Sequence, residues 1–227
     1  MTLQWYPGHM TKARREIVKL LPSQDVVIEV LDARLPAASS NPAVTELRRD
    51  KANIKVLTKS DLADPEVTAE WLEYFNALPN VRAFASTTDN PTETRKKIAE
   101  LTKDAAAHRG PDKNVRALIC GVPNVGKSTL INTLNGQRVA KTGDEPGITK
   151  TEQKIALESD CYLVDTPGLL WPRIVVEQSG YHLAASGGIG RNAYDEEEVA
   201  LALLASVRGP YGERLRARYK LDDFTAA

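Results

Sequence analysis

The stretch GVPNVGKST at residues 121–129 limits the possible fold of this chain more than any other part of the sequence. It fits the pattern G-x-x-x-x-G-K-[ST] and lies between the apolar run RALIC and the helical stretch STLINTLN. In this order a strand leads into a glycine-rich loop, whose N–H groups wrap a phosphate at the start of a helix. We expect Lys127 to bridge the β- and γ-phosphates and the Ser128 hydroxyl to ligate magnesium. The predicted nucleotide-binding loop contains Asn124, Val125, Gly126, Lys127, Ser128 and Thr129.

The element DTPG at residues 165–168 ends a second apolar run, downstream of this loop. There Asp165 is placed to contact magnesium through water, and the Gly168 N–H is placed to approach the γ-phosphate. The intervening stretch 143–151 is polar and rich in turn residues, and Thr149 is its candidate to close over the γ-phosphate and the magnesium. The alternative for Thr149 is an ordinary loop threonine.

Short apolar runs alternate with helical patterns along the chain, which indicates βαβ units and an α/β fold. We expect a mostly parallel sheet with helices on both of its faces. Residues 152–157 are expected to pair with 161–165 as an antiparallel hairpin. The predicted strands are residues 25–31, 53–58, 81–86, 115–121 and 161–165, and the predicted helices are 10–20, 43–50, 67–78, 92–107 and 127–135. The expected buried face of the third helix consists of Val67, Trp71, Tyr74, Phe75 and Leu78.

Composition excludes several other classes of protein. The formal net charge of the 227 residues is zero, so any attraction for nucleic acid must come from local patches. Cys120 and Cys161 are not part of a CxxC pair, which argues against a cysteine-bound zinc and favours buried free thiols. No apolar run reaches the length of a membrane span, and Pro7 and Gly8 interrupt the region where a signal peptide has its apolar core. We therefore expect a cytoplasmic protein.

The tetrapeptide TKSD at residues 58–61 predicts which base is bound. An aspartate at position 61 accepts paired hydrogen bonds from the N1–H and the exocyclic amine of guanine, a donor pair that adenine lacks. Lys59 is expected over the base plane, next to Thr58 and Ser60. The following run 81–87 ends in Ser86 and Thr87, which are suited to backbone contact with the guanine carbonyl.

These base-reading elements precede the phosphate loop, which is the reverse of the usual order. Ligands of open α/β sheets bind at the carboxyl ends of the strands, wherever each strand stands in the chain. If the original ends were joined through the connector 105–114, the same site would survive with reordered elements. We therefore interpret residues 1–173 as a circularly permuted P-loop GTPase domain. Beyond Trp171 no strand-like run follows, and 194–207 and 211–220 indicate a C-terminal helical region, 174–227.

The motif order TKSD, AST, GVPNVGKST, PGIT, DTPG resembles the circularly permuted GTPases that assist ribosome assembly. The motifs WYPGHM (5–10), DARLP (32–36), SSNP (39–42) and LLWP (169–172) resemble the ribosome biogenesis GTPase A (YlqF/RbgA) family in particular. The resemblance implies GTP hydrolysis with magnesium during late maturation of the large ribosomal subunit. It implies contact with the subunit precursor and its rRNA, and a monomer away from the ribosome.

The chain departs from the family pattern at three places. Thr58 stands where the family usually has Asn, and Ser40 stands where it usually has Arg. The family's C-terminal helical domain also continues beyond the position of Ala227. These departures bear on base affinity and on ribosome contact.

The family resemblance implies two further roles in hydrolysis. Leu169 follows DTPG, where many GTPases have a water-orienting Gln, so the water must be oriented from elsewhere. The resemblance points to His9, whose imidazole can hydrogen-bond a water; the alternative is a capping or packing histidine at the start of helix 10–20. Asn124 resembles the residue that helps to hold a potassium ion against the phosphates in related GTPases.

In the C-terminal region, Tyr211, Leu215 and Tyr219 form an apolar stripe with Arg214 and Arg218 beside it. From the residues alone this is a solvated helix face; the family resemblance implies that its arginines contact rRNA phosphates. Two other functions remain open from the sequence: a regulatory GTPase with a protein effector, and a nucleotide-binding scaffold with little turnover. Asp61 argues against an ATP-using enzyme.

Overall fold

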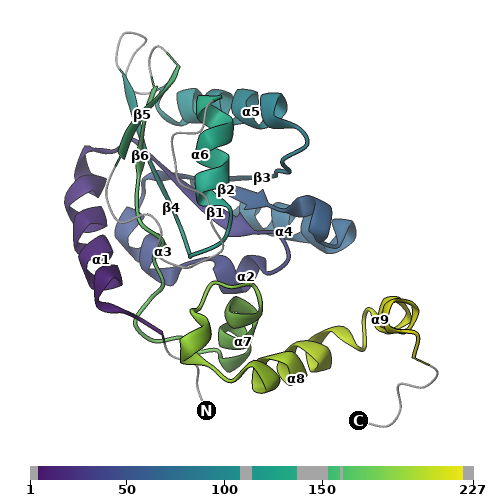
Figure 1. Cartoon of the computed structure of the whole chain (residues 1–227). Helices are drawn as coiled ribbons and strands as arrows, with labels where there is room; N and C mark the ends of the chain where they lie inside the picture. Colours follow the sequence, from purple (N-terminus) through teal and green to yellow (C-terminus); the bar gives the residue numbers. More distant parts are fainter. Residues whose placement is uncertain (1–4, 108–113, 137–152, 159–160, 222–227) are drawn as a thin grey trace.

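The computed structural model of the chain describes residues 5–107, 114–136, 153–158 and 161–221, with backbone alone for 153–158. Its centre is a six-stranded sheet with the strand order β3-β2-β1-β4-β6-β5 (Figure 1). All neighbouring strands run parallel except β5 and β6, which pair antiparallel as expected. The strands are β1 (Val26–Asp32), β2 (Ala52–Thr58), β3 (Val81–Ala85), β4 (Val115–Gly121), β5 (Gln153–Glu158) and β6 (Cys161–Asp165).

The apolar content of the strands follows from their position in the sheet. Every residue of the central strand β1 is buried, and in its neighbour β4 only Arg116 is exposed. A strand covered by helices on both faces must be apolar on both sides, and this requirement explains the continuous runs VVIEVLD and VRALICG. All five predicted parallel strands are present, within one or two residues of the expected bounds.

Helices cover both faces of this sheet. Helices α5 and α6 lie side by side on one face, where Arg95 of α5 donates to the Thr133 carbonyl of α6 at 3.1 Å. Helices α1, α3 and α4 lie on the opposite face (Figure 1). The helices are α1 (Gly8–Leu20), α2 (Pro36–Ser39), α3 (Pro42–Arg48), α4 (Pro65–Ala77), α5 (Pro91–Ala105), α6 (Lys127–Asn135), α7 (Glu177–Ala185), α8 (Glu196–Val207) and α9 (Gly212–Tyr219). Short 3₁₀ turns occur at Leu21–Ser23, Ser60–Leu62 and Arg191–Ala193.

The buried face of α4 differs from the expected one. Val67 is 43% exposed and Tyr74 is 56% exposed, whereas Thr68 and Phe75 are buried. The helix packs against β3, which is the edge strand, so the sheet covers only a narrow stripe of it. The apolar residues of α4 outnumber the positions that this stripe can bury. The prediction was therefore right about the helix and wrong about part of its face.

The C-terminal region begins with α7, which the sequence patterns did not predict. Leu183 and Ala184 of α7 belong to the same buried cluster as the residues of the central sheet, and α7 packs against α2. Helices α8 and α9 extend away from the sheet (Figure 1). In the part of the chain that the structure describes, Val199 is the buried residue of α8, and α9 has none. The proposed division at residue 173 therefore lies upstream of a helix that shares the main core.

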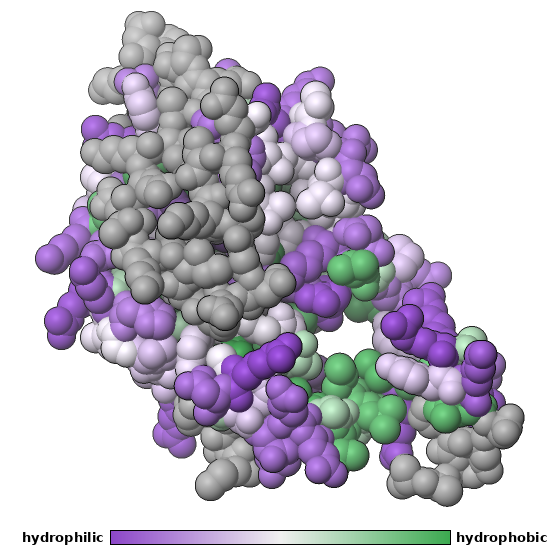
Figure 2. Space-filling view, in the orientation of Figure 1, coloured by the Kyte–Doolittle hydropathy of each residue, from purple (hydrophilic) through white to green (hydrophobic). Residues whose placement is uncertain are grey.

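Apolar surface is exposed on α8. Leu201 and Leu203 are 60% and 40% exposed, and Figure 2 shows an apolar patch in this part of the molecule. Within the described residues, no helix has the length and hydropathy needed to cross a membrane.

Candidate nucleotide-binding site

The phosphate loop connects the buried end of β4 to the first turn of α6. Two of its residues have left-handed backbone conformations, Asn124 with φ 62° and Gly126 with φ 91°. A Cβ atom on Gly121 would lie 2.7 Å from the Val30 carbonyl oxygen, so this position requires glycine. Helix α6 begins at Lys127 as predicted, and its N-terminus, which has no side-chain cap among the described residues, lies at the loop. This geometry is the one that binds a phosphate at a helix N-terminus.

Lys127 and Asp165 form a buried ion pair across the site. The two residues are 6% and 0% exposed, and the Lys127 ammonium donates to Oδ1 of Asp165. Burial raises the pKa of the Asp165 carboxyl, and the Lys127 charge opposes this shift. The structure thus brings together the two elements that the sequence assigned to the phosphates and the metal.

The second oxygen of Asp165, Oδ2, is buried and has no hydrogen-bond partner among the described residues. A buried acceptor of this kind needs a donor or a cation. Carboxylate and hydroxyl oxygens suit Mg²⁺, and Ser128 lies in the first turn of α6 beside Lys127. The residues present therefore fit a magnesium ion. Thr149, the third expected contact, lies outside the described residues.

The DTPG turn lies directly against the phosphate loop. Thr166 fixes its start by donating to the Ile119 carbonyl at 2.8 Å. A Cβ atom on Gly168 would lie 3.1 Å from Pro123, so glycine permits this close approach. The next N–H, that of Leu169, donates to the Gly121 carbonyl at 3.0 Å.

The TKSD element lies beside the phosphate loop, although the two are far apart in the sequence. Thr58 ends β2, and its hydroxyl contacts the carbonyl oxygens of Leu31, at 2.9 Å, and of Val125. The Lys59 ammonium donates to the carbonyl of Asn124 at 2.7 Å. The expected proximity of the two elements is therefore present. The Thr58 hydroxyl makes the link to the loop.

The remaining base-site candidates follow on from this contact. The Ser86 N–H donates to the Leu57 carbonyl at 2.8 Å, and the Ser60 N–H approaches the Ser86 carbonyl at 3.4 Å. These bonds place the end of β3 against the TKSD turn. Asp61 is exposed and Thr87 is half-buried.

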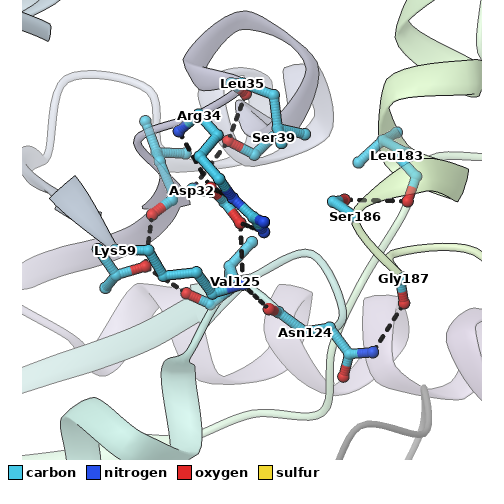
Figure 3. A network of polar contacts seen from close by, with 12 residues as sticks. Asp32, Arg34, Leu35, Ser39, Lys59, Asn124, Val125, Leu183, Ser186 and Gly187 are labelled. Atoms are coloured by element: carbon cyan, nitrogen blue, oxygen red, sulfur yellow. Dashed lines mark hydrogen bonds and ion pairs between the residues drawn. The ribbon is translucent and has the colours of Figure 1, made fainter. Parts of the chain in front are cut away.

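A cluster of charges that the sequence reasoning gave no role surrounds Lys59 (Figure 3). Asp32, at the end of β1, is 1% exposed and accepts from the Lys59 ammonium at 2.9 Å. Arg34 binds the same carboxylate through Nε at 2.9 Å and Nη2 at 2.7 Å. Burial by itself raises the pKa of Asp32, but hydrogen bonds and charge from Arg34 and Lys59 bring that pKa below its ordinary value. The sequence signal for this cluster was the presence of opposite charges in the motifs DARLP and TKSD.

Asn124 lies where the C-terminal region meets the phosphate loop, and His9 lies beside Trp5, which contacts that region at Gly190. His9 is exposed in the first turn of α1, and its ring meets Trp5 edge-on with a centroid distance of 6.4 Å. The Asn124 side chain donates from Nδ2 to the Gly187 carbonyl at 2.8 Å (Figure 3). A Cβ atom on Gly190 would lie 3.1 Å from the Trp5 ring. The catalytic role of His9 and the potassium role of Asn124 stay predictions.

The sheet order and the site define a class of protein. A phosphate loop follows β4, an acidic metal-site candidate ends β6, and a lysine–aspartate base-reading turn follows β2. All three lie at the carboxyl ends of parallel strands, although the base-reading turn comes first in the chain. The chain is a P-loop GTPase with a circularly permuted order of motifs.

Comparison with known proteins identifies the family. The model of the family described as "50S ribosome-binding GTPase" matches residues 116–217. Ribosome biogenesis GTPase A of Bacillus pumilus is 42% identical over 98% of this chain and 81% of its own length. The protein of the same name from Priestia megaterium is 40% identical over 98% of this chain and 80% of its own length. The chain belongs to the ribosome biogenesis GTPase A family.

A solved structure supports the same assignment. The chain resembles the crystal structure of GNP-bound YlqF from T. maritima with a TM-score of 0.63 and 29% sequence identity. That match covers 95% of this chain and 79% of the other.

Proposed function

We propose that this protein binds and hydrolyses GTP in the cytoplasm during late maturation of the large ribosomal subunit, acting as a monomer that contacts the subunit precursor and its rRNA. The main support is the match to the 50S ribosome-binding GTPase model, which runs from β4 through α9. A mouse relative, mitochondrial ribosome-associated GTPase 1, is 36% identical over 88% of the chain and 65% of its own length, and its name gives a ribosomal role as well.

In the proposed reaction, the phosphate-site residues bind and orient GTP. Lys127 leaves its ion pair with Asp165 and bridges the β- and γ-phosphates. Ser128 and Asp165, with Thr149, would hold magnesium, which would supply positive charge to neutralise the phosphates. Thr58, Lys59, Ser60 and Asp61, followed by Ser86 and Thr87, hold the guanine.

The attacking water must be oriented from outside the DTPG element. Leu169 is 1% exposed and apolar, so it neither reaches nor orients a water. His9 is the proposed orienting group, because it is exposed on a helix turn beside Trp5. Trp5 in turn lies against Gly190, in the turn that holds the Asn124 side chain through Gly187. Asn124 is the proposed potassium contact in that loop.

The C-terminal helices are the proposed ribosome-contacting part. Arg214 and Arg218 of α9 lie over the rings of Tyr211 and Tyr219, at 5.6 and 6.0 Å from the ring centroids. This arrangement keeps the guanidinium groups at the surface, where they are available to phosphates. Because Gly187, in the turn after α7, contacts the phosphate loop, a change at the nucleotide has a short path to these helices.

The decisive experiment compares GTP hydrolysis with and without purified large ribosomal subunits, in potassium and in sodium buffer. We expect subunits to stimulate hydrolysis, and His9→Ala to remove the stimulation while GTP still binds. His182→Ala is the matched control, because His182 is a half-buried histidine that contacts Ser206 at 3.2 Å. Tight GTP binding with no stimulation by subunits would contradict the ribosomal role and favour the effector or scaffold alternative.

A further inference from the structure

The motif SSNP has no part in the chemistry described so far, yet Asn41 at its centre is 1% exposed and fully bonded. Its Oδ1 accepts from the Ala43 N–H at 2.9 Å and so caps α3. Its own N–H donates to Oε1 of Glu29 at 2.9 Å. Its Nδ2 donates to the Leu169 carbonyl at 2.8 Å, across 128 positions of sequence. One side chain thus joins a helix start to the residue that follows DTPG.

A buried ion pair fixes the backbone of Asn41. Glu29 and Lys55 are register partners on β1 and β2, are 0% and 3% exposed, and form an ion pair. Lys55 also donates to the Ser40 hydroxyl at 3.1 Å, and its ammonium lies 5.0 Å from the Phe75 ring centroid. Glu29 therefore fixes the turn at residues 40–41 through the Asn41 N–H, and Lys55 fixes it through the Ser40 hydroxyl.

A buried ion pair is poor evidence for stability, because desolvation of two charges offsets most of their attraction. Apolar residues at the centres of two buried strands would serve the core equally well. The pair at positions 29 and 55 contributes something that apolar residues lack, which is a fixed acceptor for the Asn41 N–H and a fixed donor to Ser40. Its specific effect is the position of this turn.

The segment that Asn41 holds is the end of the DTPG element. The Leu169 N–H is bound to Gly121 of the phosphate loop, and the Leu169 carbonyl is bound to Asn41. Both polar groups of this residue are therefore fixed. Gly168, one position earlier, packs against Pro123. The position of the Gly168 N–H relative to the phosphate loop therefore depends on the two Leu169 hydrogen bonds and on the packing against Pro123.

We infer that Asn41 is a positioning residue that sets the Gly168 N–H for the γ-phosphate, and so favours GTP over GDP. The inference rests on the proposed nucleotide site. It explains why an amide is used at this position. Serine or aspartate would cap α3 as well as asparagine, but neither supplies a side-chain N–H for the Leu169 carbonyl while its oxygen caps the helix.

The test distinguishes the two roles of the Asn41 side chain, which are the cap of α3 and the hydrogen bond to the Leu169 carbonyl. Asn41→Ser keeps a capping oxygen and loses the Nδ2 donor, whereas Asn41→Ala loses both. Asp64→Ala is the control for the loss of a helix cap, since Asp64 caps α4 by accepting from Glu66 and Val67 at 3.0 and 3.3 Å; its other side-chain partner is Tyr211, the N-cap residue of α9. Affinities for GDP and for a non-hydrolysable GTP analogue, single-turnover hydrolysis of GTP and the melting temperature are measured for all four proteins.

For Asn41→Ser we expect the ratio of GTP-analogue to GDP affinity to fall about fivefold to tenfold, the effect of one lost hydrogen bond. Hydrolysis falls with it, while GDP affinity stays within about twofold because GDP has no γ-phosphate. Asn41→Ala should show the same fall in the affinity ratio and also a lower melting temperature. Asp64→Ala should have a lower melting temperature and an unchanged affinity ratio. An unchanged ratio in Asn41→Ser, or an equal loss for GDP, overturns the inference. A wild-type protein that binds neither nucleotide overturns the proposed function instead.

Discussion

Replacement of Asp32 by asparagine tests how the base-reading lysine is held. Asp32→Asn keeps the shape of the side chain and removes its charge. In the wild-type chain both carboxylate oxygens are occupied, since Oδ1 accepts from the Arg34 N–H at 3.0 Å and from Nε, and Oδ2 accepts from Nη2 and from Lys59. The asparagine amide retains one acceptor and turns an N–H₂ group towards two cations. Lys59 is then left with the Asn124 carbonyl as its main contact.

The magnitude follows from the bonds that are lost. A hydrogen bond to a charged group contributes about 1.5 to 3 kcal/mol when it is buried. The side chains of Arg34 and Lys59 are 35% and 27% exposed, so water compensates part of each loss. We therefore expect a fall of about 2 kcal/mol in the free energy of unfolding, or roughly 4 to 8 °C in melting temperature for a chain of this size. GDP should dissociate about tenfold faster, because Lys59 is no longer fixed beneath the base.

The effect has a defined dependence on pH. Arg34 and Lys59 lower the pKa of Asp32 from the ordinary value of 3.8. A carboxyl with a lowered folded-state pKa adds stability above that ordinary value, and this stability is lost as the pH falls through the folded-state pKa. The difference in unfolding free energy between wild type and Asp32→Asn should therefore be largest above about pH 4 and shrink below it.

The assay is thermal and urea unfolding from pH 2.5 to 7, together with stopped-flow release of a fluorescent GDP. Asp50→Asn is the control, because Asp50 is exposed and the substitution makes the same change in net charge. Equal stability of Asp32→Asn and wild type at neutral pH would refute the reasoning, as would a difference that does not depend on pH. Faster GDP release without loss of stability would show that the cluster acts on the ligand alone.

Other substitutions and a chemical probe test the rest of the site. Lys127→Ala should abolish nucleotide binding. It also removes the cation beside the buried Asp165 carboxyl, whose pKa burial raises, so in urea unfolding the free energy lost relative to wild type should be smallest in acid and should grow as the pH rises above 3.8. Thr58→Val should lower the melting temperature by about 2 to 4 °C and speed GDP release, because the hydroxyl that contacts two carbonyls is lost. Cys120 and Cys161 are buried, and burial raises the pKa of Cys120, so a disulfide reagent should modify these thiols only as fast as the protein unfolds. Rapid modification of the folded protein would contradict the packing around β4 and β6.

Much of the architecture could be predicted because it depends on local patterns. Helix α6 occupies the residues expected from the phosphate-loop motif, since the loop and the helix N-terminus form one unit. The position of TKSD followed from a rule about strand ends that does not depend on chain order. The charged residues inside the apolar strands gave no prediction, and Glu29 and Lys55 are direct neighbours across β1 and β2.

The remaining features depend on tertiary contacts that no local pattern encodes. Asn41 reaches Leu169 only because the fold places the start of α3 beside the end of DTPG. The face of α4 was misassigned because its burial depends on how much of the helix the edge strand covers. Helix α7 was missed because Ser179 and Gly180 weaken its apolar periodicity, and its burial comes from packing against α2.

Circular permutation gives the chain a connection that the usual motif order lacks. The DTPG element leads directly into the C-terminal region. The segment from Leu169 to Gly187 is bound to the phosphate loop at both of its ends. At the upstream end Leu169 is bound to Gly121, and at the downstream end the Gly187 carbonyl accepts from Asn124. A shift of the loop on GTP binding must therefore move or break one of these two attachments. Because α7 and Val199 of α8 belong to the main core while α9 has no buried residue among those described, the expected consequence is a movement of α9 relative to the site.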